Sequence, residues 1–125
     1  MCAFAILKKQ IPDILFWESD LIKKAFDYML KSEYKDDLDD NIYGYPYNSP
    51  GFEIPFVLDI FNIFGKEKII EISGLWINEQ FRRCYNKDTR MMDKNTTDPL
   101  TLTARIYELY RLNVNVLNKI NIIID

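Results

Sequence analysis

The chain has 125 residues, of which 48% are hydrophobic and 28% charged, and its formal net charge is −3. This balance is typical of one globular domain spanning residues 1–125 and excludes a disordered chain. Histidine is absent, which excludes Ser-His-Asp and Cys-His catalysis, and two distant cysteines cannot complete a usual zinc site.

The N-terminal segment predicts neither a secretory leader nor a membrane anchor. Its apolar run before Lys8 and Lys9 is too short for a signal-peptide core, and no run in the chain approaches the roughly 18 apolar residues of a membrane span. Cys2 and Cys84 lie far apart in the sequence, so we expect reduced thiols and a cytoplasmic location. No cofactor is expected, because the four glycines form no phosphate-binding loop.

Residues 12–33 have the clearest helical period of the chain. Apolar side chains recur there every three or four residues, at Ile14, Trp17, Leu21, Ala25 and Tyr28. Ser19 and Asp20 are both favourable N-cap residues, so a break near residues 18–20 would divide this stretch into two helices.

Residues 34–52 have no hydrophobic period and are punctuated by two glycines and two prolines, at Gly44, Pro46, Pro50 and Gly51. We expect a long ordered loop on the surface. Loops of this length tend to be functional or disordered, and the aromatic residues Tyr43, Tyr45, Tyr47 and Phe52 argue against disorder.

The next segment, EIPFVLDIFNIFG, favours a buried helix that begins near Pro55 and ends before Gly65. The alternative is a β-hairpin over residues 57–73, favoured by the β-branched Ile69, Ile70 and Ile72 around the turn GKEK. The following LWINEQFRRCY predicts another helix.

The C-terminal third begins with a polar loop, NKDTRMMDKNTT, and continues with a strong helix start. Asp98 is a favourable cap and Pro99 suits the first turn, and the helical spacing continues for about five turns to Ile120. The alternation in NVNV and INIIID leaves a closing strand as an alternative.

Together these segments predict a mainly α, single compact domain of about four helices with a long ordered loop at 34–52. The alternative is an α+β fold with a hairpin at 57–73 and a C-terminal strand.

Charge is spread unevenly along the chain. Between Asp13 and Asp59 there are eleven carboxylates against four lysines, a net charge of −7, whereas all five arginines lie at or after Arg82. An acidic surface repels nucleic acid and accelerates encounter with a basic protein.

The acidic stretch also holds the residues that we expect to bind a partner. They are four aspartates and three tyrosines: Asp36, Asp37, Asp39, Asp40, Tyr43, Tyr45 and Tyr47. The aspartates would attract and pair with arginines, while the rings would bury area at low entropic cost. The alternative is a solvated acidic turn whose tyrosines pack on the domain.

A calcium loop that starts at Asp37 lacks its two defining residues. Ile42 stands where the loop requires glycine, and Asn48 stands where it requires glutamate. We therefore expect no specific metal site, and loose association of the aspartates with a divalent cation stays open.

The segment FRRCYNKDTRMMDK offers a basic alternative site. Its basic residues, interleaved with Phe81 and Tyr85, are Arg82, Arg83, Lys87, Arg90 and Lys94. Such a pattern can bind single-stranded nucleic acid. Asp88 and Asp93 dilute the charge, which favours a helix end whose arginines flank a buried Phe81 and Cys84.

A small, acidic, histidine-free chain of this kind is similar in general character to bacterial toxin-immunity proteins of the contact-dependent-inhibition and colicin class. The resemblance covers the composition and residues 36–47. It implies a non-enzymatic inhibitor that blocks the groove of a cognate basic toxin, such as a tRNase or DNase domain, without binding nucleic acid or membrane itself. The alternatives are a regulatory or adaptor domain, for example a phage-encoded inhibitor, and a carboxylate-dependent enzyme.

Overall fold

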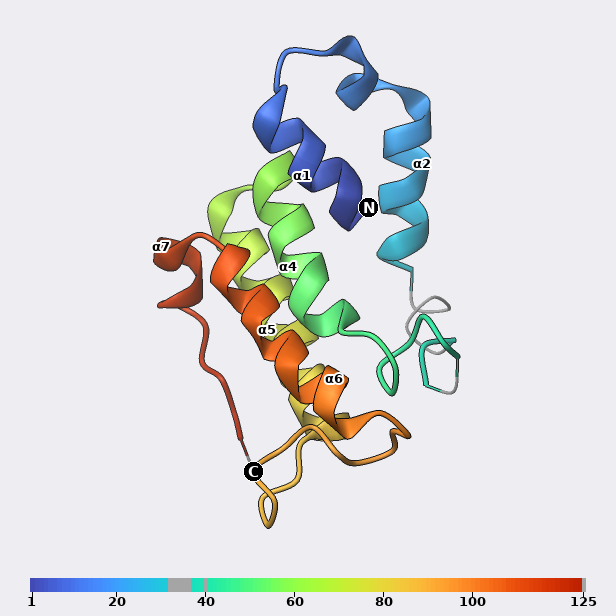
Figure 1. Cartoon of the computed structure of the whole chain (residues 1–125). Coiled ribbons are helices and arrows are strands. Elements are labelled where there is room, and N and C mark those ends of the chain that lie inside the picture. The colour runs from blue at the N-terminus through green and yellow to red at the C-terminus, as the bar shows by residue number, and fades with distance from the viewer. Residues whose placement is uncertain (32–36, 40, 125) are drawn as a thin grey trace.

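The fold is mainly helical, as the sequence predicts. A computed structural model describes residues 1–31, 37–39 and 41–124, and these residues form helices and loops with no β-strand (Figure 1). The helices in this part of the chain are α1 (Cys2–Gln10), η1 (Leu15–Glu18), α2 (Asp20–Met29), α4 (Pro50–Phe61), α5 (Lys66–Cys84), α6 (Pro99–Ala104), η2 (Arg105–Arg111) and α7 (Val114–Leu117), where η denotes a 3-10 helix. None of these helices is both long enough and apolar enough to span a bilayer.

Helix α4 lies at the centre of the molecule and packs on α1, α5 and η2 (Figure 1). Nine of its twelve residues are buried, which is the pattern of a helix that is apolar on all sides. It begins at Pro50, a few residues before the expected start, so the predicted loop at 34–52 is shorter at its C-terminal end. Asn62 ends the helix in the left-handed conformation, which asparagine tolerates.

Helices α4 and α5 approach each other closely at Gly51. A Cβ atom placed there would lie 2.4 Å from the Trp76 carbonyl oxygen, so only glycine fits. The Gly51 amide donates to Oε1 of the buried Gln80 at 3.1 Å, and Gln80 Nε2 donates to the Tyr45 carbonyl at 3.1 Å. Gln80 therefore links α5 to the start of α4 and to the loop that precedes α4.

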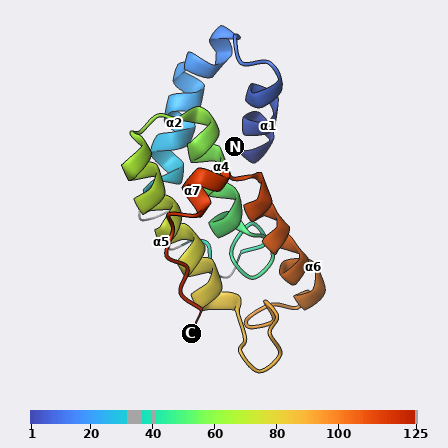
Figure 2. The same cartoon turned by 90° about the vertical axis from the view of Figure 1, so that its left-hand side faces the viewer.

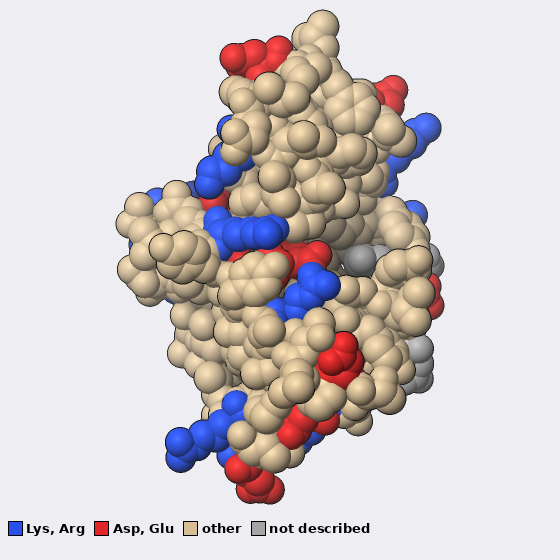
Figure 3. All heavy atoms as spheres, in the orientation of Figure 1, with Lys and Arg blue, Asp and Glu red and all other residues tan. Residues whose placement is uncertain are grey.

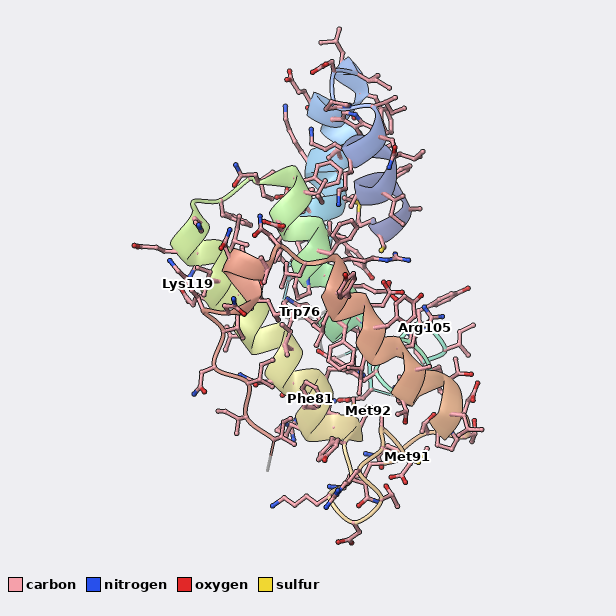
Figure 4. All side chains as sticks on the ribbon, turned by 60° about the vertical axis from the view of Figure 1, so that its left-hand side comes forward. Trp76, Phe81, Met91, Met92, Arg105 and Lys119 are labelled. Carbon is pink, nitrogen blue, oxygen red and sulfur yellow. The ribbon has the colours of Figure 1, made fainter. Side chains whose placement is uncertain are left out.

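The alternative of a hairpin at 57–73 is wrong and the expected buried helix is confirmed, because α4 and α5 are two helices joined by residues 62–65. The buried side chains of α5 recur at helical spacing, at Ile69, Ser73, Trp76, Ile77, Gln80, Phe81 and Cys84. β-branched residues in the first half of α5 favoured a strand locally, but burial of this helical face outweighs that preference. Figure 4 shows Trp76 and Phe81 projecting from α5 toward the helix formed by α6 and η2.

The N-terminal part of the chain is the unit formed by α1, η1 and α2. The predicted break near residues 18–20 is confirmed, since η1 ends at Glu18 and the Ser19 side chain caps α2 by accepting from the Ile22 amide. Trp17 Nε1 donates to the Ile11 carbonyl at 2.8 Å and fixes the turn between α1 and η1. Helix α1 packs on α4, and α2 contacts η1 and packs its buried Phe26 ring against Phe61 of α4, with the ring centroids 5.0 Å apart.

The C-terminal third begins as predicted, because Asp98 caps α6 through the Thr101 amide and Pro99 occupies the first turn. The expected five-turn helix is instead divided into α6, η2 and α7. The alternative of a closing strand is wrong. Residues 121–123 lie along α5, where Asn78 donates to the Asn121 carbonyl at 3.0 Å and accepts from the Ile123 amide at 2.8 Å (Figure 2).

Candidate functional site

The structure brings together only part of the predicted partner-binding surface. Asp36 and Asp40 lie outside the described residues, and Asp37 is exposed. Asp39 forms an ion pair with Arg83, so the chain's own arginine neutralises this carboxylate.

Tyr45 is the clearest correction to that surface, because its side chain is only 1% exposed and cannot serve as an outward anchor. Its ring lies 6.2 Å from that of Trp76, with the Arg83 guanidinium 4.7 Å from the ring centroid. The Tyr45 amide donates to the carbonyl of the buried Leu38 at 2.9 Å. Tyr43 and Tyr47 remain exposed.

The basic segment fits the helix-end interpretation. Arg82 and Arg83 both pair with Glu79 of the same helix, while Phe81 and Cys84 are buried. Burial raises the pKa of the Cys84 thiol to about 11, so this thiol is uncharged at neutral pH.

A cavity of about 450 Å³ opens between α1, α2 and α4. Apolar side chains from these three helices form much of its wall. The polar groups that line it are Tyr28, Tyr43, Asn48 and Glu53. Tyr28 and Tyr43 are both exposed, and Asn48 is held in place by its donation to the Ile42 carbonyl at 2.6 Å. The volume is within the range of small-molecule sites, about 300–1,000 Å³.

Glu53 connects this cavity to a cluster of ion pairs between α4 and η2. Its Oε1 accepts from Ser49 Oγ at 3.2 Å and from Arg105 Nη1 at 3.4 Å. Arg105 Nη1 also lies 4.0 Å from Glu108 Oε1, and Arg111 Nη1 lies 3.1 Å from Glu108 Oε2. Figure 3 shows acidic and basic side chains gathered near the middle of this face.

The backbone of η2 explains how three members of this cluster line up. Arg105, Glu108 and Arg111 are each three residues apart, and a 3-10 helix has three residues per turn. The three side chains therefore form one row along η2. In an α-helix, which has 3.6 residues per turn, side chains three residues apart would point in successively rotated directions.

Burial and charge alter the chemistry of two groups in the cluster. Burial, and next repulsion by Glu108, raise the pKa of Glu53, although Arg105 and Ser49 oppose this. Burial, followed by the nearby Glu53 and Glu108, raises the pKa of the Cys2 thiol, whose sulfur accepts from Arg111 Nη1 at 3.9 Å. Glu53 therefore takes up a proton more readily than an ordinary glutamate.

Sequence reasoning missed this cluster. One signal was present in RIYELYR, where opposite charges stand three residues apart at 105, 108 and 111. No pattern pointed to Glu53 as their companion, because it lies 52 residues before Arg105. Among the residues that the structure describes, no three acidic or cysteine side chains gather as a metal site.

Comparison with known proteins gives one informative similarity. No protein-family model matches the chain, and no solved structure matches it. The chain is 35% identical over 111 residues to "Archaeal glycosylation protein Q" of the archaeon Haloferax volcanii. The match covers 89% of this chain and 29% of that protein, so the chain spans less than a third of the relative's length.

The toxin-immunity interpretation is therefore wrong. The relative is an archaeal glycosylation protein, which overturns the expected bacterial immunity function, the cognate basic toxin and the block of its groove. General acidity and a tyrosine-rich segment misled the prediction, because unrelated folds share both properties.

Proposed function

We propose that this chain contributes to a glycosylation pathway by binding a saccharide in the cavity between α1, α2 and α4. The observation that carries the proposal is the cavity wall, which Glu53 lines together with Tyr28, Tyr43 and Asn48. The similarity to a glycosylation protein supports the same ligand class.

The residues suit a sugar for two chemical reasons. Carboxyl and amide groups can hydrogen-bond to the several hydroxyls of a sugar ring, and tyrosine rings can pack against its apolar C–H face. Arg105 and Ser49 hold the Glu53 carboxyl in place, so its orientation is set before a ligand arrives.

The role that we propose is binding rather than catalysis, in keeping with the expectation of a non-enzymatic protein. Both carboxylates of the cluster are engaged by arginines, which suits a fixed recognition group. The cytoplasmic location stays a prediction.

The test is a binding measurement on the purified chain. We would screen glucose, galactose, mannose, N-acetylglucosamine and their common disaccharides by saturation-transfer NMR and titrate any hit by calorimetry. We expect Glu53→Ala to weaken binding at least about tenfold, since a hydrogen bond to a charged group contributes roughly 1.5–3 kcal/mol. Tyr43→Ala should also weaken it.

Tyr110→Ala is the matched control, because Tyr110 is 93% exposed and does not line the cavity. It should leave the affinity unchanged. Failure of every sugar to bind, or binding that survives both cavity substitutions, would refute the proposal.

A second candidate is acid–base chemistry on the same ligand, favoured by the raised pKa of Glu53 beside Glu108. It predicts slow hydrolysis of nitrophenyl glycosides by the wild-type chain, with loss of that activity in Glu53→Gln. An inactive wild-type chain that still binds sugar would leave binding as the function.

A further inference from the structure

Glu108 of η2 is an acidic side chain that is almost fully buried, with only 3% of the residue exposed. Glutamate is rarely buried to this degree unless its charge is paired. Its two oxygens lie near two arginines of the same helix, Oε1 at 4.0 Å from Arg105 Nη1 and Oε2 at 3.1 Å from Arg111 Nη1. Glu108 therefore stands between two cations in the row along η2.

Each of these arginines contacts a residue that lines the cavity. Arg105 Nη1 lies 3.4 Å from Glu53 Oε1 of α4, and Arg111 Nη1 lies 3.9 Å from the Cys2 sulfur of α1. Glu53 and Cys2 both line the cavity, whereas Glu108 does not. The row on η2 thus contacts two different helices of the cavity wall from behind.

We propose that Glu108 is a positioning residue for the cavity. Through Arg105 it holds Glu53 of α4, and through Arg111 it holds Cys2 of α1, so that it fixes these two parts of the wall relative to each other. Arginine suits this role because one guanidinium can contact two acceptors at once. The effect on ligand binding rests on the saccharide site proposed above, but the contacts themselves can be tested without a ligand.

The charge of Glu108 acts on both residues. After the larger effect of burial, repulsion by Glu108 raises the pKa of Glu53, and burial followed by Glu53 and Glu108 raises the pKa of the Cys2 thiol. Other ionisable or charged groups near the cluster come from η2, α2 and the loop before α4: Arg105, Tyr107, Arg111, Tyr28 and Tyr43. Removal of the Glu108 charge should therefore lower the pKa of Glu53 and that of Cys2 together.

The experiment measures both groups in Glu108→Gln, which keeps the size of the side chain and removes its charge. Carboxyl-carbon NMR follows the titration of Glu53. The pH dependence of the reaction with iodoacetamide follows the Cys2 thiol, because Cys84 is fully buried. Both titration midpoints should move to lower pH, and the sugar affinity should fall about tenfold, roughly the loss of one well-placed hydrogen bond.

Glu79→Gln is the matched control. Glu79 also pairs with two arginines, Arg82 and Arg83, but it lies on α5 and does not line the cavity. Its replacement should leave the titration midpoints of Glu53 and Cys2 and the sugar affinity unchanged. General loosening of the fold could weaken binding, but it would not lower both midpoints in Glu108→Gln while sparing them in the control.

Arg105→Gln is the second variant, because breaking a buried ion pair can unfold Glu108→Gln, whereas Arg105 is partly exposed. Arg105 lowers the pKa of Glu53, so its removal should move the Glu53 midpoint to higher pH and again weaken binding. Midpoints that stay at their wild-type values, or a wild-type sugar affinity in Glu108→Gln, would overturn the proposal. Midpoints that move as expected in a chain that binds no sugar would refute the saccharide function alone.

Discussion

Helix α4 and the N-terminal unit of α1, η1 and α2 contain similar apolar side chains but place them differently. Nine of the twelve residues of α4 are buried, whereas Ala5 is the one buried residue among the nine of α1. The difference follows from position, since α4 is enclosed by α1, α5 and η2 while α1 has the core on one side. Apolar content therefore stabilises the fold in α4 and leaves exposed apolar surface in the N-terminal unit.

The largest expected effect on stability comes from removing a buried leucine of α4, compared with removing an exposed leucine of the N-terminal unit. Leu58 of α4 is 0% exposed and Leu15 of η1 is 83% exposed. Leu58→Ala should lower the free energy of unfolding by about 2–5 kcal/mol, because it leaves a cavity in the core. Leu15→Ala should change it by less than about 0.5 kcal/mol.

Urea unfolding followed by tryptophan fluorescence measures both values. Comparable losses in the two variants would show that Leu15 is packed as closely as Leu58 in the isolated chain, against this comparison.

The next effect tests the close contact of α4 with α5. Gly51→Ala should destabilise the fold by about 1–3 kcal/mol, because its Cβ would lie 2.4 Å from both the Trp76 carbonyl oxygen and Gln80 Cβ. Gly74→Ala in α5 is the matched control. Its Cβ would lie at an ordinary 3.6 Å from Ile120 Cγ2, so the better helix propensity of alanine should stabilise the fold by roughly 0.5–1 kcal/mol.

Thermal unfolding checks both variants: the melting temperature should fall for Gly51→Ala and rise for Gly74→Ala. A Gly51→Ala protein as stable as wild type would mean that α4 and α5 are farther apart than this geometry requires.

The smallest expected effect on stability concerns Glu53 of α4, which lines the cavity between α4 and the N-terminal unit. Because burial and repulsion by Glu108 raise its pKa above the ordinary 4.5, the folded chain binds this proton more tightly than the unfolded chain does. The resulting stabilisation is complete below pH 4.5 and is lost as the pH rises through the folded-state pKa. Glu53→Gln cannot ionise, so it should melt slightly above wild type at pH 8, by about 1–3 °C.

The difference in melting temperature between Glu53→Gln and wild type should decrease as the pH falls toward 4, because wild-type Glu53 becomes protonated there. Melting temperatures measured from pH 4 to pH 8 check this. A variant that melts below wild type at pH 8 would show that the ion pair with Arg105 outweighs burial and repulsion.

Much of the local structure was readable from the sequence. The helical class, the break at Ser19, the cap at Asp98 and the burial of the segment containing Phe56 follow from side-chain period and capping chemistry. These features depend on residues within a few positions of one another, which is the range over which a sequence pattern carries information.

The candidate site was not readable in this way. Glu53 meets Arg105, and Gln80 meets the Tyr45 carbonyl, only because α4 brings η2 and α5 against itself. The sequence shows that Asp39 is charged and that Tyr45 is aromatic. Only the tertiary packing brings Arg83 into contact with both side chains. Sequence alone determined the helical class and several helix starts, because these depend on neighbouring residues. Tertiary structure decided where the C-terminal helices break and which side chains line the candidate site, because contacts between distant positions arise from packing and leave no local period.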